Sequence, residues 1–214
     1  KKANPKEYDV GKRIILGAGY GMGANKFHAT CLQYGVDIGE ELATRAIRAY
    51  REKYSSVVQL WRATEASAVN AVKSPGKTFQ SGAGGKVLWG MSQDRRFLVA
   101  RLPSGRHLRY YRPSLRMIEG PYGEKEQVHY WTTGIDGRMV EEHTYGGALV
   151  ENVTQAIARD IMAAGMKNCE EAGYNLILTV HDELVADTDK TSVDNFIKAM
   201  CDLPPWAASC PISA

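Results

Sequence analysis

Two adjacent carboxylates near the carboxyl end of the chain lie between two short, mostly apolar segments. His181, Asp182 and Glu183 separate residues 175–180 from residues 184–186. Apolar runs on both sides of a short polar segment predict two strands joined by a tight hairpin, which would hold both carboxylates at one end of a small sheet. Rigidly held oxygen ligands suit Mg²⁺ that is bound together with substrate phosphates. Asp182 and Glu183 are therefore candidate metal ligands and catalytic residues, and an exposed polar turn is the alternative interpretation.

A glycine-rich segment near the amino end combines a cation, an apolar side chain and an aromatic ring. Lys12, Leu16 and Tyr20 recur every four residues, which places them on one face of a helix. Glycines in that helix destabilise it by about 1 kcal/mol each relative to alanine, and a locally unfavourable sequence indicates function. Lys12 can hold a phosphate while a base or sugar packs on Leu16 and Tyr20, and glycine lets a second backbone approach closely. A helix ending in a glycine-rich cap is the alternative; a dinucleotide-binding fingerprint is not indicated, because Met22 stands where its third glycine belongs.

Arginines are concentrated in residues 95–116, a segment of 22 residues that holds seven arginines and no acidic residue. They are Arg95, Arg96, Arg101, Arg106, Arg109, Arg112 and Arg116. Phe97, Tyr110 and Tyr111 are interleaved with them, so neighbouring strands would form a surface that neutralises phosphates and stacks on sugars or bases. A basic, merely solvated sheet face is the alternative, although such faces usually carry carboxylates as well.

The net charge of +3 hides an uneven distribution of charge along the chain. Residues 1–118 carry 21 Lys and Arg against 8 Asp and Glu, whereas residues 119–214 carry 6 against 16. The first part therefore attracts polyanions, and the second part has carboxylates to spare for a metal site.

The sequence does not indicate a membrane protein, a secreted protein or a thiolate metal site. No apolar run approaches the roughly 18–20 residues of a membrane span, and residues 1–5 are not followed by the apolar core of a signal peptide. Cys31, Cys169, Cys201 and Cys210 have neither the spacing of a zinc site nor that of a redox pair, so inert free thiols are expected. We expect a soluble cytoplasmic protein without a membrane partner.

Hydrophobic spacing and turn signals predict the elements that position these residues. Helices are expected over residues 7–19, 25–32, 38–72 (a pair that ends at 74–76), 145–171 and 192–201. Strands are expected over residues 86–89, 97–101, 107–111, 128–132, 139–143, 175–180 and 184–186. Hairpin turns are expected at residues 103–105 and 135–137. The predicted fold class is α+β.

The order and spacing of these motifs resemble those of the family A (Pol I-like) DNA polymerases, and of their phage members in particular. Lys12, followed after seven residues by Tyr20 and Gly21, resembles the family's motif B, and residues 180–185, VHDELV, resemble its motif C. Three further segments fit the family: residues 50–54, residues 102–106, and residues 145–160, which are similar to the palm helix of phage members. The resemblance covers nearly the whole chain.

The resemblance implies template-directed addition of deoxynucleotides to the 3′ end of a DNA primer by two Mg²⁺ ions. Lys12 would hold the incoming triphosphate and protonate the leaving pyrophosphate, and Leu16 would pack against the incoming sugar and base. Tyr20 and Gly21 would close over the nascent base pair. The implied partners are a dNTP and a DNA primer–template.

The resemblance also assigns roles in the acidic part of the chain. Asp182 would ligate the metal, with Glu183 beside it, and His181 would lie near the primer terminus. Gln155 would reach the minor groove near the primer end. Together with the arginine-rich strands, the full set of expected DNA contacts is Tyr20, Arg101, Arg106, Arg109, Gln155 and His181.

The implied fold is part of the right hand of these polymerases. Residues 1–76 would form the fingers, residues 77–144 a basic β-meander insertion, and residues 145–214 the palm with its long helix, hairpin and last helix. The motif A strand with its metal-binding Asp is expected upstream of Lys1, with the remainder of the palm and the thumb as further partners. We therefore expect the isolated chain to bind DNA weakly and not to polymerise.

The chain departs from the family pattern at four positions. Leu16 stands where many members have an aromatic ring in the middle of the motif B helix. Tyr8 stands where an Arg is usual before the motif B Lys, with Arg13 or Lys6 as nearby substitutes. On the palm helix, Gly147 and Glu151 stand where Arg and Asn are usual. These departures affect the groups expected to contact the triphosphate, the sugar and the minor groove.

Two other classes of function stay open. A non-catalytic nucleic-acid-binding fragment would use the basic part of the chain and need no metal. A metal-dependent phosphohydrolase would act on simple nucleotides, but the HD type places its His–Asp pair on a helix with further ligands, whereas His181 and Asp182 lie in a predicted turn. A phage-encoded polymerase would act in the cytoplasm of the host cell.

Overall fold

The computed structural model describes residues 4–82, 86–120, 123–189 and 192–214. The chain forms two compact units. The first unit comprises the residues up to Arg101 together with His107–Asn152, and the second comprises Leu102–Arg106 and Val153–Ala214. None of the described helices is long and apolar enough to cross a membrane.

Helices open the first unit, as the hydrophobic spacing predicts. They are α1 (Pro5–Ala18), α2 (Ala24–Gln33), α3 (Gly39–Lys53) and α4 (Ser55–Lys73). The side chains of Ala18, Phe27, Cys31, Ala43 and Ile47 form a buried core, and Val10 and Ile14 of α1 pack against it. Burial raises the pKa of the Cys31 thiol, and all four cysteines are free thiols, as predicted.

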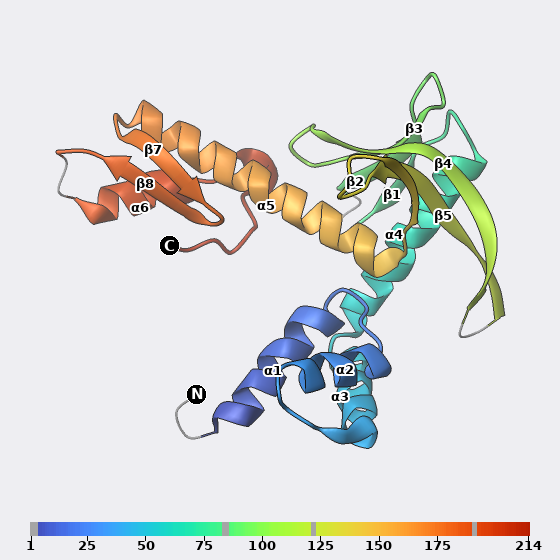
Figure 1. The fold of residues 1–214 in the computed structure, drawn as a ribbon. Helices are drawn as coiled ribbons and strands as arrows, with labels where there is room; N and C mark the ends of the chain where they lie inside the picture. Colours follow the sequence, from blue (N-terminus) through green and yellow to red (C-terminus); the bar gives the residue numbers. More distant parts are fainter. Residues whose placement is uncertain (1–3, 83–85, 121–122, 190–191) are drawn as a thin grey trace. The chain divides into compact units, whose positions relative to one another are not determined.

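A six-stranded antiparallel sheet follows, with its strands in chain order (Figure 1). Its strands are β1 (Phe79–Ser81), β2 (Val87–Met91), β3 (Phe97–Arg101), β4 (His107–Gly120), β5 (Gly123–Thr133) and β6 (Met139–His143). Both predicted hairpin turns are confirmed, because residues 103–105 join β3 to β4 and residues 135–137 join β5 to β6. The sequence did not predict β1 or the full length of β4 and β5. Charged residues in β4 and β5 hide the alternation of apolar and polar side chains that indicates a strand, although these residues pair in register between the two strands.

The two faces of the sheet differ in burial. On the inner face, Trp89, Leu98 and Tyr110 are buried, and α4 packs against strands β1 to β5. The residues that alternate with these on β3 and β4 form the outer face, where Arg101 and Arg109 are exposed. The inner face therefore holds the core of this region, and the outer face carries the exposed arginines.

The second unit consists of most of α5 (Gly146–Glu171), a β-hairpin, the helix α6 (Val193–Cys201) and the short 3-10 helix η2 (Pro205–Ala207). The hairpin pairs β7 (Asn175–Val180) with β8 (Glu183–Asp187). The Tyr174 and Phe196 rings meet edge-on at 4.9 Å between centroids, and Asn168 on α5 donates to the Asp202 carbonyl at 2.8 Å. The predicted long helix, hairpin and last helix are thus confirmed, and the fold class is α+β.

Candidate nucleotide and nucleic-acid sites

The predicted nucleotide-binding residues lie at the end of α1 in the first unit. Lys12 and Leu16 are exposed on the helix surface, with Leu16 60% exposed. Tyr20 does not continue this face, because α1 ends at Ala18 and Tyr20 lies half-buried in the following turn. The turn is closed by the Tyr20 amide, which donates to the Gly17 carbonyl at 3.1 Å. Turn geometry, rather than helical spacing, therefore sets the position of the Tyr20 side chain.

The turn at residues 19–21, called here the glycine turn, is held by two distant segments of the first unit. The Trp61 indole on α4 donates to the Gly19 carbonyl at 3.0 Å. At the start of α5, a Cβ on Gly147 would lie 2.2 Å from the Tyr20 carbonyl oxygen, and one on Gly146 would lie 2.2 Å from the Trp61 carbonyl oxygen. Neither position can accept a side chain unless the backbone moves.

This packing gives a physical reason for one departure from the family pattern. A second backbone does approach the turn closely, but the glycines that its approach requires are Gly146 and Gly147, whereas the prediction placed them in the α1 segment. An Arg at residue 147 would collide with the backbone of Tyr20. Glycine at this position thus lets the start of α5 pack against the glycine turn.

Arg13, a possible substitute for an Arg at residue 8, contacts another side chain of the first unit. Its guanidinium stacks on the ring of Tyr34 at 3.7 Å from the centroid, and its Nε is buried with no hydrogen-bond partner among the described residues. Tyr8 is 44% exposed. The side chain of Lys6, the other candidate, lies outside the described part of the chain.

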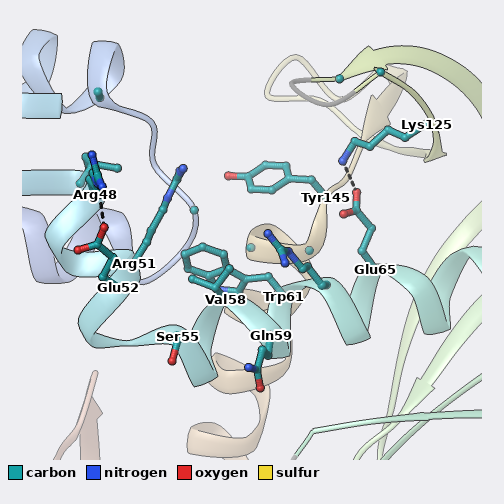
Figure 2. Close-up of a pocket in the computed structure, with 18 of the residues that line it drawn as sticks. Arg48, Arg51, Glu52, Ser55, Val58, Gln59, Trp61, Glu65, Lys125 and Tyr145 are labelled. Atoms are coloured by element: carbon teal, nitrogen blue, oxygen red, sulfur yellow. Dashed lines mark hydrogen bonds and ion pairs between the residues drawn. The ribbon is translucent and has the colours of Figure 1, made fainter. Parts of the chain in front are cut away.

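A cleft of about 930 Å³ opens beside the glycine turn in the first unit (Figure 2). It is lined from α3, α4, the adjoining ends of β4 and β5, and the start of α5; among its lining residues are Gly21, Arg48, Arg51, Glu52, Trp61, Arg62, Glu65, Lys125, Tyr145 and Gly147. Ion pairs at 2.8 Å join Arg48 to Glu52 and Lys125 to Glu65, and Figure 2 shows Tyr145 pointing toward Arg51. The sequence did not predict this cleft, because its walls come from segments far apart in the chain.

The predicted carboxylate hairpin is present in the second unit. Val180 pairs with Glu183, which leaves His181 and Asp182 as the two turn residues. All three polar residues, His181, Asp182 and Glu183, are exposed. His181 has φ +54°, in the left-handed region that two-residue hairpin turns require but that a residue other than glycine adopts at a cost of about 1 kcal/mol. The polar turn is therefore both exposed and locally strained.

The donor set at this turn suits Mg²⁺ but is small. Asp182 and Glu183 offer carboxylate oxygens, which Mg²⁺ prefers, and Mg²⁺ sites commonly use one or two carboxylates together with water and substrate phosphates. Within the described ranges, no group of three or more His, Cys, Asp or Glu side chains is placed to hold a metal ion. Asp182 and Glu183 therefore fit part of a coordination shell.

Arg106, predicted to contact DNA, contacts α5 within the second unit. Its Nε donates to Asp160 at 2.5 Å and its Nη2 donates to the Ala156 carbonyl at 2.8 Å. Ser104, in the same turn, also donates to Asp160. Gln155, predicted to reach the minor groove, is exposed on the same helix. No local pattern in the sequence indicates this contact, because its partners lie about 50 residues apart in the chain.

The remaining arginines and tyrosines of the arginine-rich segment divide between the two faces of the sheet. Arg101 and Arg109 lie on the outer face, exposed as a DNA contact requires. Tyr110 lies on the inner face, only 5% exposed, so its predicted part in a stacking surface is wrong. Its hydroxyl accepts from Asn152 of α5 at 3.1 Å, and burial raises the pKa of Tyr110 to about 12.

The predicted site residues are thus distributed over both units. Lys12, Leu16, Tyr20, Gly21, Arg101 and Arg109 belong to the first unit, and Arg106, Gln155, His181, Asp182 and Glu183 belong to the second. Within the first unit, the structure brings Tyr20 and Gly21 together with the start of α5. Within the second, it brings the carboxylates to the end of an exposed hairpin.

The chain is similar to a DNA polymerase of Bacillus phage SP02. The two are 34% identical over 208 residues, which make up 95% of this chain and 31% of the phage protein. The chain therefore spans about a third of the length of the curated relative that it matches. No protein-family model matches the chain, and no solved structure matches it.

Proposed function

We propose that the chain is the fingers and C-terminal palm portion of a family A DNA polymerase of the phage type, which adds deoxynucleotides to the 3′ end of a DNA primer. The observation that carries this proposal is the similarity to the phage DNA polymerase over nearly the whole chain. It is supported by the Lys12 and Tyr20-Gly21 spacing and by the hairpin that presents Asp182 and Glu183. Residues 1–76 correspond to the fingers, 77–144 to an inserted β-meander and 145–214 to the palm.

In this proposal the end of α1 and the glycine turn bind the incoming nucleotide. The exposed ammonium of Lys12 holds the triphosphate and gives a proton to the departing pyrophosphate, while Leu16, one turn further along, packs against the sugar and base. Tyr20 and Gly21 close over the nascent base pair. Their turn is held by Trp61 and Gly147, so little ordering is needed when the nucleotide binds.

The hairpin of the second unit supplies the carboxylates. Asp182 and Glu183 would hold Mg²⁺, which when bound stabilises the negative charge that develops on the phosphoryl oxygens. His181 would lie near the primer terminus, and Gln155 on α5 would contact the minor groove. Because two carboxylates make up only part of a two-metal site, at least one further carboxylate ligand is to be sought outside the described residues.

Arg101 and Arg109 bind DNA phosphates in this proposal. Both are exposed on the outer face of the sheet, and residues 95–116 around them contain no acidic residue. Arg106 is left out of this set, because Asp160 and the Ala156 carbonyl already accept hydrogen bonds from its guanidinium.

Primer extension by the polymerase that contains this chain tests the proposal. Replacing Asp182 by Ala is expected to lower the extension rate at least about 100-fold while DNA affinity in a filter-binding assay stays the same, because the carboxylate acts on the chemical step. The matched control is Asp187→Ala, at the far end of β8 on the same hairpin, which should extend the primer normally. Equal losses in the two variants, or equal loss of extension and DNA binding in Asp182→Ala, would indicate that Asp182 has a structural role.

A non-catalytic nucleic-acid-binding fragment is the second candidate. It is favoured by the small donor set at residues 182–183 and by the basic outer face. This candidate predicts that Asp182→Asn has no metal-dependent effect of any kind. A phosphohydrolase would instead release product from simple nucleotides without primer or template.

A further inference from the structure

Three aromatic side chains stand in register across the outer face of the sheet. Phe97 of β3 pairs with Tyr111 of β4, and Tyr111 pairs with Trp131 of β5. Phe97 and Tyr111 are half-buried with ring centroids 5.3 Å apart, and Trp131 is 39% exposed. We call these three residues the aromatic row. They are not part of the core, because the buried side chains of β3 and β4 point to the inner face.

Arginines surround one end of the aromatic row. The guanidinium carbon of Arg96 lies 5.9 Å from the Phe97 ring centroid and 5.8 Å from that of Tyr111. Arg109 lies 6.0 Å from the Phe97 centroid, and Arg112 lies 5.6 Å from the Tyr111 centroid. These distances are longer than the 3.7 Å of the stacked Arg13–Tyr34 pair, so the guanidiniums do not stack closely on the rings.

The backbone holds two of these arginines in an unusual arrangement. The pairing of β4 with β5 is irregular between Tyr111 and Ser114, and Arg112 within this bulge has φ +46°. The Arg112 amide donates to the Arg96 carbonyl at 2.7 Å, which ties the bulge to the start of β3. Bulges redirect side chains, and strain at a residue other than glycine is typical of functional sites. Both features favour a binding role for this face.

The charge around the row determines which partner it fits. Arg96, Arg109 and Arg112 lie within reach of the rings, and Arg101 lies further along the same face. No acidic residue occurs from 95 to 116. Asp94, in the β2–β3 turn, lies 3.9 Å from Arg96, and Glu141, which pairs with Trp131 at the other end of the row, is ion-paired with Arg116. An apolar protein segment would gain nothing from these cations. A polyanion that also carries exposed aromatic rings would bind the cations with its charges and stack its rings on the aromatic row.

We infer that the aromatic row and its arginines bind single-stranded DNA, with bases stacked on Phe97, Tyr111 and Trp131 and phosphates bound by Arg96, Arg109 and Arg112. Neighbouring strands are about 4.8 Å apart, so the row offers two or three successive stacking positions. Duplex DNA can satisfy the arginines but not the rings, because its bases are stacked on each other. The surface therefore prefers an unpaired strand.

This surface is separate from the proposed catalytic residues and deepens the DNA-binding role proposed for the outer face. It rests on the proposed function only for the choice of DNA over RNA. A polymerase needs an unpaired template strand ahead of the primer end, and the surface has the chemistry to hold one. None of Lys12, Tyr20, Asp182 or Glu183 belongs to it.

The test measures binding of a fluorescent single-stranded oligonucleotide and of a hairpin duplex to the 214-residue chain by anisotropy. Tyr111→Leu keeps an apolar side chain but removes the ring, and it is expected to weaken single-strand binding at least about fivefold while leaving duplex binding unchanged. Trp131→Leu should act in the same direction. Thermal unfolding of each variant checks that the sheet is intact.

The arginines are tested with a variant pair matched in charge. Arg109→Ala with Arg112→Ala should weaken single-strand binding and lower the slope of log affinity against log salt by about 1.4. Arg45→Ala with Lys53→Ala removes the same charge from exposed positions on α3 and should leave both quantities nearly unchanged.

Four outcomes would overturn the inference. Two concern Tyr111→Leu: an unchanged affinity for the single strand, or equal losses of affinity for single strand and duplex. The third is tighter binding of the unmodified chain to RNA than to DNA of the same sequence. The fourth is a dimer of the chain in light scattering that becomes a monomer in Trp131→Leu. The Asp182→Ala chain should bind the oligonucleotide as well as the unmodified chain. If Asp182→Ala left primer extension by the whole polymerase unchanged while Tyr111→Leu still weakened single-strand binding, the proposed catalysis would fail and the surface would stand; the reverse pattern would overturn the surface alone.

Discussion

The first unit contains the glycine turn, and the second contains the turn at residues 181–183, called here the carboxylate turn. The sequence assigns chemistry to both segments, but they are held in different ways. The glycine turn is bound by Trp61 and lies against Gly147, residues 40 or more positions away in the chain. The carboxylate turn is positioned by the pairing of its own two strands, and His181, Asp182 and Glu183 are exposed. One turn depends on tertiary packing, and the other depends on local hairpin geometry.

The difference extends to the strands and helices around the two turns. The helices next to the glycine turn bury a core that includes Phe27 and Cys31. By contrast, Ile177 and Leu178 of β7 are 61% and 55% exposed, although an apolar run of this kind usually indicates a buried strand. Substitutions near the glycine turn should therefore affect stability much more than substitutions in the carboxylate hairpin.

The largest expected effect is that of Gly147→Ala. The added Cβ would lie 2.2 Å from the Tyr20 carbonyl oxygen, which can move only if the backbone of the glycine turn moves with it. We expect a loss of about 3 kcal/mol or more in the free energy of unfolding, measured by urea denaturation.

Gly11→Ala is the matched control for this substitution. Gly11 lies inside α1, and apart from the adjoining backbone of that helix no described atom would lie within 4 Å of a Cβ there, so the helix should gain about 0.5–1 kcal/mol. If Gly147→Ala proved as harmless as Gly11→Ala, the glycine turn would not be locked, and the contrast with the carboxylate turn would be lost.

A smaller effect is expected from the buried hydroxyl of Tyr110 in the first unit. Its pKa of about 12 in the folded chain lies above that of an unfolded tyrosine, near 10, so between these values only the unfolded chain releases the proton. The stability from this group is complete below pH 10 and falls by up to about 1.4 kcal/mol per pH unit above it. Tyr110→Phe should show a shallower loss from pH 10 to 11.5 in urea denaturation; identical slopes would mean that the hydroxyl is hydrated.

The smallest effect is expected at the carboxylate turn itself. His181→Gly relieves the left-handed backbone conformation but adds entropy to the unfolded chain, so we expect a net gain of about 0.5 kcal/mol. His107→Gly, at the regular start of β4, should instead be destabilising. Hydrogen exchange of the amides of β7 and β8 measures the stability change caused by His181→Gly. If His181→Gly proved destabilising, as His107→Gly is expected to be, His181 would make contacts that hold the hairpin together.

Much of the fold could be predicted from the sequence because its elements have clear local signals. The helices, the hairpin turns at 103–105 and 135–137, and the hairpin that presents Asp182 all lie where hydrophobic spacing and turn residues indicate. The predictions were incomplete where charged residues occupy a strand, as in the second half of β4, because cross-strand pairing rather than alternation stabilises such a strand.

The site was predicted less completely, for the same physical reason. Arg106 and Tyr110 both look like nucleic-acid contacts in a basic, aromatic segment, yet Arg106 is bound by Asp160 and Tyr110 is buried beside Asn152. Their partners lie on α5, more than 40 residues away, and no local pattern indicates such a pairing. The roles assigned to Lys12, Asp182 and Gln155 stay predictions.

By itself, the sequence determined which chemical groups the chain carries and the order of its elements, because side-chain type, hydrophobic period and turn residues act over a few positions. It placed the cations before the carboxylates and the carboxylates in a hairpin turn. Only the tertiary structure decided which arginines and rings remain accessible, why Gly147 must be a glycine, and that Phe97, Tyr111 and Trp131 form one row. Those properties depend on the register between strands and on contacts between distant segments, which are set when the whole unit packs.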